Sequence, residues 1–341
     1  MGISSVDLRT DGMKRIFRVG VAIILSVVAV WLSFRKIDLA ELGKAFSQVR
    51  WFWVLTAAVN TVFSVYILGL RWRILLRPQT RIPLRKLFRF NNISQMVNIA
   101  APARMGEFVR AYLVSQEGGA SVSFTLGTIL VEHLLDFFVF AAVWIVTPAM
   151  MAVGGPFAPR SAFRVLLFVP ALILISFALW PKLFQRAAAF VVRLFPTKVR
   201  ERILRIVQQG LEAFATLRGT KTSTVLVAWT IGLIFSQILT IALVFRAIGL
   251  ALGLGPALIV LLAIQVVSLP PSAPGKIGVY EYAVILALAA FGIGRPEALA
   301  CGLILHVTAS LPKIILGLVF LSGSDIRLRS LRAAEAGEQK F

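Results

Sequence analysis

Two short stretches, Ala101–Gly106 and Ala273–Gly278, decide how this sequence folds: the first reads Ala-Pro-Ala-Arg-Met-Gly and the second reads Ala-Pro-Gly-Lys-Ile-Gly. Both copies share the pattern Ala-Pro-small-cation-apolar-Gly, and each is soon followed by a carboxylate, Glu107 or Glu281. Both lie between apolar stretches, where Pro and Gly break a helix and a charged side chain is costly. In a membrane protein, a repeated helix break that carries a repeated charge is typical of a transporter with two related halves.

The composition places the chain among membrane proteins. Hydrophobic residues make up 58% of it, charged residues make up only 15%, and the mean hydropathy is +0.86, which excludes an ordinary soluble domain. Apolar runs of bilayer-spanning length recur between residues 19 and 322, so no segment is left for a separate catalytic domain. The sequence therefore predicts an all-α polytopic membrane protein that is not an enzyme.

The net charge of +21 indicates contact with anionic lipid headgroups rather than with nucleic acid. The basic residues cluster in loops between apolar runs, as they do in the cytoplasmic loops of inner-membrane proteins. A single cysteine, Cys301, and two histidines give no disulfide framework and no metal-ligand cluster. We therefore expect no metal and no other cofactor.

Six apolar runs predict full membrane spans, and two interrupted runs predict broken helical segments. The expected spans are residues 17–34, 51–70, 122–147, 163–181, 223–246 and 297–321. The broken segments are residues 87–117, interrupted at 102–106, and residues 255–293, interrupted at 270–278. Each is either a re-entrant hairpin or a pair of short spans, and both alternatives return the chain to the side from which it entered.

The same pattern sets the expected domain organisation. Residues 1–16 form a cytoplasmic N-terminus, residues 17–322 a transmembrane domain, and residues 323–341 a cytoplasmic tail. Within the transmembrane domain, residues 51–181 form the first half and residues 223–322 the second. Between them, residues 182–221 are predicted to form an amphipathic helix at the cytoplasmic interface with one face toward lipid.

Loop charges orient the predicted spans. The loop at 71–89 carries seven basic residues and no acidic one, which marks the cytoplasmic side. With both termini inside, the weakly charged loops at 148–162 and 247–254 lie outside. The first broken segment then enters from the cytoplasm and the second from outside, so the two motif copies are inverted relative to each other. Inverted repeats with interrupted helices place a substrate site near the bilayer midplane.

Arg104, Glu107 and Arg110 share one face of the helix that is expected to begin after Gly106. Two guanidiniums beside the free N–H groups of a helix start form a receptor for a phosphate, which Arg can bind through two parallel hydrogen bonds. The alternative is an internal ion-pair network, in which Glu107 neutralises one arginine and stabilises the break.

Glu132 and Asp136 stand four residues apart on one face of the 122–147 span, and His133 lies beside them. Two carboxylates at this depth need cations, and Arg104 or Arg110 is expected to supply them. Two interpretations stand. The carboxylates bind an amine headgroup or carry protons, or they only balance the arginines.

The second half repeats the cation and the carboxylate as Lys276 and Glu281, with Tyr280 alongside. His306 lies in the final span at about the place that Glu132 takes after the first motif. An imidazole exchanges protons near neutral pH, although a lone buried histidine is also common as a structural residue. Glu132, Asp136 and His306 are therefore the candidates for proton coupling.

Three stretches in this order, Arg104–Ala111, Glu132–Asp136 and Pro274–Glu281, resemble the lysylphosphatidylglycerol synthase transmembrane family. The resemblance covers residues 15–320, nearly the whole chain. It implies an inner-membrane protein with about eight membrane-crossing elements that moves lipids between leaflets. In fused members, a cytoplasmic aminoacyl transferase domain makes the lipid that is moved. This chain resembles a stand-alone flippase without the synthase domain.

The expected function is therefore a lipid translocase that moves a phospholipid, an aminoacyl-lipid, or a glycolipid or polyprenyl-phosphate lipid through a polar midplane groove. The expected substrate-binding residues are Arg104, Glu107, Arg110, Glu132, Asp136, Lys276, Tyr280 and Glu281. The alternative is a secondary transporter of a small anionic solute, which a closed midplane pocket would favour over a groove open to lipid. Expected partners are membrane lipids, and candidate partners are a lipid-modifying enzyme or glycosyltransferase and a second copy of the chain.

Overall fold

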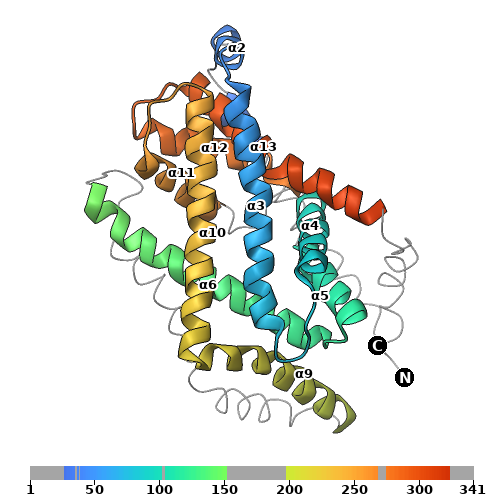
Figure 1. The fold of residues 1–341 in the computed structure, drawn as a ribbon. Helices are drawn as coiled ribbons and strands as arrows, with labels where there is room; N and C mark the ends of the chain where they lie inside the picture. Colours follow the sequence, from blue (N-terminus) through green and yellow to red (C-terminus); the bar gives the residue numbers. More distant parts are fainter. Residues whose placement is uncertain are drawn as a thin grey trace, which may run out of the picture.

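The structure, a computed structural model, describes residues 27–34, 37, 39–101, 104–151, 197–267 and 274–322. These residues form helices and turns with no strand among them, which confirms the all-α membrane fold (Figure 1). The predicted span at 163–181, residues 1–16 and the tail at 323–341 lie outside the described residues. The helices are α2 Leu39–Ser47, α3 Trp51–Leu76, α4 Leu84–Ala100, α5 Met105–Gly118, α6 Val122–Met151, α9 Thr197–Ala215, α10 Thr220–Ala247, α11 Leu254–Val267, α12 Val279–Ala289 and α13 Arg295–Ser322.

Four of the described helices are long and apolar enough to cross a membrane: α3, α10, α13 and the Val122–Val143 part of α6. They match four of the predicted spans. The predicted span at 17–34 is described only over residues 27–34, which are helical. Large apolar side chains on α3 are exposed along one face, for example Phe52 at 71% and Phe63 at 54%. Such a face is suited to contact with lipid chains.

Helices α3 and α10 form an antiparallel pair through the middle of the molecule (Figure 1). The Asn60 amide donates a hydrogen bond to the Thr240 hydroxyl over 2.8 Å, and eleven residues further along α3 Arg71 donates to the Thr230 hydroxyl over 3.0 Å. Because the partner number falls as the α3 number rises, the two helices run in opposite directions. Helices α3 and α10, which the sequence pattern assigns to different halves, are therefore packed antiparallel.

The first broken segment is a helical hairpin made of α4 and α5. At its tip, the Gly106 N–H donates to the Asn98 side-chain oxygen over 2.8 Å. At its open end, the Thr80 hydroxyl donates to the Gly118 carbonyl over 2.7 Å. A Cβ at Gly106 would lie 2.0 Å from the Ser94 carbonyl oxygen, so the close approach of the two helices requires glycine there. The chain therefore reverses at the break and returns to the end from which it came.

The second broken segment comprises α11, a short 3-10 turn at Pro274–Lys276 and α12. Helices α11 and α12 pack against each other and lie beside the α2 end of α10 (Figure 1). Helix α4, by contrast, follows α3 directly and packs along it. The two broken segments are therefore attached to opposite ends of the central pair.

Helix α9 and the α3–α4 loop lie at the same end of the molecule, where the Gln79 side chain donates to Glu212 over 2.8 Å. Helix α9 is the described part of the predicted amphipathic helix, and it packs on α6 where a Cβ at Gly127 would meet the Gly210 carbonyl oxygen at 2.5 Å. Leu211 and Phe214 are buried in the core beside α6. This part of the apolar face therefore packs on protein rather than on lipid.

The loop predicted at 71–89 is shorter than expected. Helix α3 continues to Leu76 and α4 begins at Leu84, so the connection covers only residues 77–83. Arg71 therefore belongs to a membrane-spanning helix and not to the cytoplasmic loop. The physical reason is that its charge is paired inside the protein, as described next.

Candidate functional site

Arg71 joins three helices at the centre of a buried polar cluster. Its side chain is 1% exposed and forms a two-pronged ion pair with Asp136 of α6, in which Nη2 lies 3.2 Å from Oδ2. Its Nε lies 3.5 Å from Glu132 Oε1, and its Nη1 reaches Thr230 of α10. A guanidinium is well suited to this role because it presents several donors in a rigid plane.

Arg110 of α5 completes the same cluster. It is 5% exposed, donates to the Glu132 carboxylate, and donates to the Asn91 side-chain oxygen over 3.1 Å. Its guanidinium also lies 4.0 Å from the centre of the Trp72 ring, a favourable cation–π contact. Every one of these contacts is internal. Arg110 therefore points into the protein. Glu107 lies within electrostatic reach of both Arg104 and Arg110, but the hydrogen bonds of Arg110 go to Asn91 and Glu132.

The cluster of Arg71, Arg110, Glu132 and Asp136 has a formal charge of zero, since two cations face two carboxylates. Buried charges are costly to desolvate and are tolerated when they are paired and hydrogen-bonded. The geometry fits the interpretation in which the carboxylates balance arginines, with Arg71 rather than Arg104 as the second cation. Arg71 was missed from the sequence, which favours a loop at that position; the signal that could have identified it is that two buried carboxylates need two cations.

The cations of the repeated motif share an unusual backbone conformation. Arg104 has φ 55° and Lys276 has φ 56°, and within the described ranges they are the two non-glycine residues with positive φ. The left-handed conformation costs about 1–2 kcal/mol for a residue with a Cβ. Backbone strain of this kind clusters at functional sites. The two motif copies thus place their cations in the same strained geometry.

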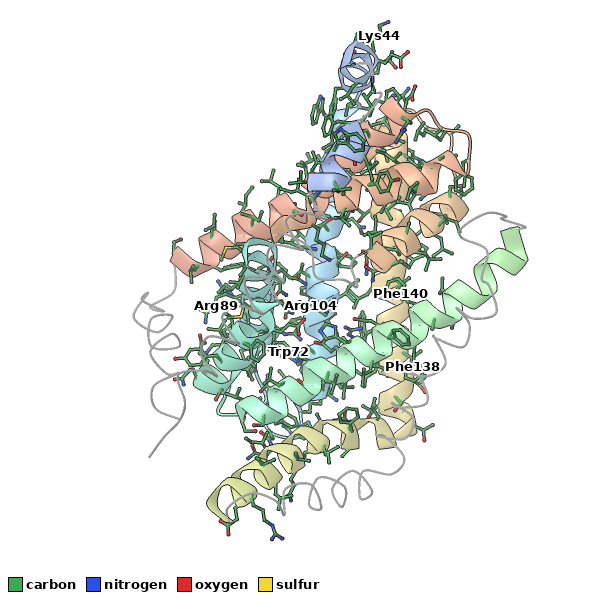
Figure 2. The ribbon with its side chains drawn as sticks, turned by 180° about the vertical axis from the view of Figure 1, so that it is seen from behind. Lys44, Trp72, Arg89, Arg104, Phe138 and Phe140 are labelled. Atoms are coloured by element: carbon green, nitrogen blue, oxygen red, sulfur yellow. The ribbon has the colours of Figure 1, made fainter. Side chains whose placement is uncertain are left out.

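The tips of the two broken segments meet. The Pro274–Lys276 turn packs against α4, and the charges of Lys276 and Arg104 lie close enough to interact. Arg104 is 58% exposed, and its contact with Glu107 is loose, at 3.5 Å between Nη1 and Oε1. Figure 2 shows Arg104 near the middle of the molecule, far from Lys44 on α2. Two like charges, one from each motif copy, therefore lie near each other at this point.

Each half also pairs its motif carboxylate with a histidine on the following long helix. Glu107 Oε1 lies 2.9 Å from His133 Nε2, and Glu281 Oε1 lies 2.6 Å from His306 Nδ1. The two pairs are separated by 26 and 25 residues, a signal already present in the sequence. The counterpart of His306 is therefore His133 and not Glu132, which corrects the correspondence expected from the sequence.

Glu281 and Tyr280 hold the second pair in place. Glu281 Oε2 accepts a hydrogen bond from the Gly278 N–H over 2.7 Å, which caps the start of α12. The Tyr280 ring stacks on the His306 ring at 4.8 Å between centres. Tyr280 therefore supports the imidazole.

In the described part of the chain, no three His, Cys, Asp or Glu residues are grouped as metal ligands.

An apolar hollow lies on the flank of α3 and α4. Its volume is about 380 Å³, and its walls are Val59, Val62, Phe63, Tyr66 and Phe88. Val59 is 62% exposed, so the hollow opens sideways to the surroundings. The lining offers nothing to a charged solute, but its size and chemistry suit a hydrocarbon chain.

The chain is similar in sequence to known membrane proteins. The model of the lysylphosphatidylglycerol synthase transmembrane region matches residues 19–317. Glycosyltransferase AglD of Haloferax volcanii is 24% identical over 378 aligned positions, which cover 96% of this chain and 59% of that protein. A UPF0104 membrane protein of Methanothermobacter thermautotrophicus is 23% identical over 280 positions, covering 76% of this chain and 82% of that one. The chain thus spans less than two thirds of the first relative's length.

Proposed function

This chain belongs to the lysylphosphatidylglycerol synthase transmembrane family, and we propose that it is a lipid translocase. It moves a phospholipid, an aminoacyl-lipid, or a glycolipid or polyprenyl-phosphate lipid between the leaflets of the cell's inner membrane. Both termini are cytoplasmic, and the two halves form an inverted repeat whose broken segments enter as re-entrant hairpins. The role involves no covalent chemistry.

One observation carries the proposal: the strained cations Arg104 and Lys276 come from equivalent positions of the two motif copies and lie near each other. Charges inside a membrane protein usually line the path of a substrate or ion. The antiparallel pairing of α3 with α10 supports the inverted repeat, because corresponding helices run in opposite directions. Such repeats bind their substrate where the interrupted helices meet.

The apolar hollow between α3 and α4 favours a lipid over a small soluble anion. A lipid headgroup bound at the break needs an apolar surface for its chains, and the exposed wall at Val59 and Phe63 supplies one. A small soluble anion has no hydrocarbon chain to place against such a surface. The hollow therefore supports a lipid as the substrate.

Proton coupling is assigned to the paired carboxylates and imidazoles. Glu132 and Asp136 are held in ion pairs by Arg71 and Arg110. In the Glu107–His133 and Glu281–His306 pairs a carboxylate is hydrogen-bonded to an imidazole, and the contact of Arg104 with Glu107 is loose. Imidazole is the side chain that ordinarily exchanges protons near neutral pH. We assign coupling to these two pairs, with His306 as one of the original candidates.

A glycosyltransferase or another lipid-modifying enzyme is proposed as the functional partner. The relative AglD is named a glycosyltransferase, and this chain aligns with 59% of it. The lipid moved by this chain is then a substrate or product of such an enzyme in the same membrane.

The test is a translocation assay in proteoliposomes that carry a fluorescent, tail-labelled phosphatidylglycerol. Dithionite quenches only the outer leaflet, so the signal should fall well below half when the purified protein is present. A parallel set should take up no radiolabelled inorganic phosphate. A signal that stays at half, or uptake of phosphate instead, would overturn the proposal. Arg104→Gln combined with Lys276→Gln should be inactive, whereas Lys44→Gln on distant α2 should be active (Figure 2).

A further inference from the structure

A third cation, Lys313 of α13, lies at the same break. Helices α13 and α4 are antiparallel: the Phe320 ring packs on the Phe88 ring at 5.9 Å, and a Cβ at Gly317 would lie 2.5 Å from the Met96 Cβ. One further turn back along α13 leads from Gly317 to Lys313. The same step along α4 leads from Met96 to its last residue, Ala100. Lys313 therefore lies level with the point at which the first broken segment turns.

Lys313 is unusual in its surroundings. From residue 298 to the end of α13 it is the one Lys, Arg, Asp or Glu. Among the described residues, the ion pairs that form do not include Lys313 or Lys276. Its charge instead interacts with the like charge of Lys276. Among the described residues, the charge that acts on Lys313 is the like charge of Lys276, so this half-buried lysine in an apolar span can accept a negative group from elsewhere.

The charges around the break do not balance. Arg104, Lys276 and Lys313 supply three positive charges, and Glu107 beside Arg104 supplies one negative charge, so 3 − 1 leaves a surplus of two. Glu281 is not counted, because it forms no ion pair with the three cations, the charge interactions of Lys276 and Lys313 do not include it, and its oxygens contact the Gly278 N–H and His306 instead. The neutral cluster around Arg71 contrasts with this site, because there every cation has its carboxylate.

We propose that Arg104, Lys276 and Lys313 form one receptor for a lipid headgroup with at least two negative charges, such as a phosphate monoester or a diphosphate. This inference rests on the proposed lipid translocation and narrows its substrate class. A phosphodiester such as phosphatidylglycerol carries one charge and leaves one surplus cation unpaired. Lys313 supplies the second charge and therefore determines specificity. Arg104 and Lys276 supply the contact that any phosphate would make.

The experiment measures equilibrium binding in phosphatidylcholine nanodiscs at pH 7, where a phosphate monoester carries about two negative charges. The probes are tail-labelled phosphatidic acid, a phosphate monoester, and tail-labelled phosphatidylglycerol with identical chains. The wild-type protein should bind phosphatidic acid at least about tenfold more tightly, as one additional charge-assisted contact allows. Lys313→Gln should bring that ratio close to one and leave phosphatidylglycerol binding within about threefold of the wild type.

Lys313→Arg keeps the charge and should keep the preference, as should the distant control Lys44→Gln. If Lys313→Gln does not fold, Lys313→Met provides a second test, because it too removes the charge and should abolish the preference for phosphatidic acid. A wild-type protein without preference, or a Lys313→Gln variant that retains it, would overturn the inference. Displacement of the labelled lipid by micromolar inorganic pyrophosphate would assign the receptor to a soluble anion instead. A wild-type protein that prefers phosphatidic acid but does not translocate lipid would refute the proposed function. It would leave the inference about this receptor intact.

Discussion

Replacing Arg71 by methionine tests whether the buried cluster is structural. The substitution keeps most of the apolar volume of the side chain but removes the charge that ties α3 to α6. Asp136 then loses its two-pronged partner, whereas Glu132 keeps Arg110. The variant should therefore insert poorly and unfold easily.

The magnitude follows from the burial of each group. Removing one partner of a buried ion pair costs about 3–5 kcal/mol. The Asp136 side chain is 33% exposed, so its stranded charge is partly solvated, and we expect a loss near the lower end, about 3 kcal/mol. Arg71→Met combined with Asp136→Leu removes both charges and leaves a neutral Arg110–Glu132 pair. Most of the lost stability should return, because an apolar pair can replace a buried ion pair.

The assay is the free energy of unfolding in mixed micelles, measured by titration with sodium dodecyl sulfate. Arg89→Met is the matched control. It breaks the ion pair with Glu117, whose two side chains are about a quarter exposed. Lys86 still neutralises Glu117 at 3.0 Å, so the loss in free energy of unfolding should stay below about 1 kcal/mol. Equal losses for Arg71→Met and Arg89→Met would refute the structural role. A double variant that is stable but cannot translocate lipid would show that Arg71 or Asp136 acts on the substrate.

Three further predictions concern the break and the topology. Arg104→Gly relieves a left-handed residue, so it should stabilise the protein by up to about 1 kcal/mol yet abolish translocation; a destabilised variant would argue against backbone strain there. His306→Gln and His133→Gln should each flatten the pH dependence of translocation in liposomes, whereas a wild-type rate that ignores an imposed pH gradient would remove proton coupling altogether. Single cysteines at Gln79 and Gly253 should be labelled from opposite sides of the membrane, and labelling from one side would end the inverted-repeat interpretation.

Much of the fold was accessible from the sequence because its signals are local. The Pro and Gly residues of Ala101–Gly106 and Ala273–Gly278 interrupt apolar runs, and the structure breaks the helices there. Four predicted spans agree with long apolar helices. The cation and the carboxylate at each break could be predicted as well, because both belong to the same short motif.

The remainder depends on contacts between distant residues. Arg71 follows an apolar run and precedes further arginines, so the sequence favoured a loop, whereas its partner Asp136 lies 65 residues away. The pairing of His133 with Glu107 was hidden because Glu132, the adjacent carboxylate, looked like the counterpart of His306. Lys313 was missed although a lone lysine in an apolar span is itself a signal.

The central claim is that a lipid phosphate passes the point at which the two broken segments meet. A phospholipid with a photoreactive group on its headgroup tests this directly, because cross-linked peptides can be identified by mass spectrometry after illumination in proteoliposomes. We expect labels on the peptides that contain Arg104 or Lys276. In the Arg104→Gln, Lys276→Gln variant, neither peptide should be labelled. Labels confined to α9 and the loop at 77–83 would contradict it, because the headgroup would then bind only at the basic surface.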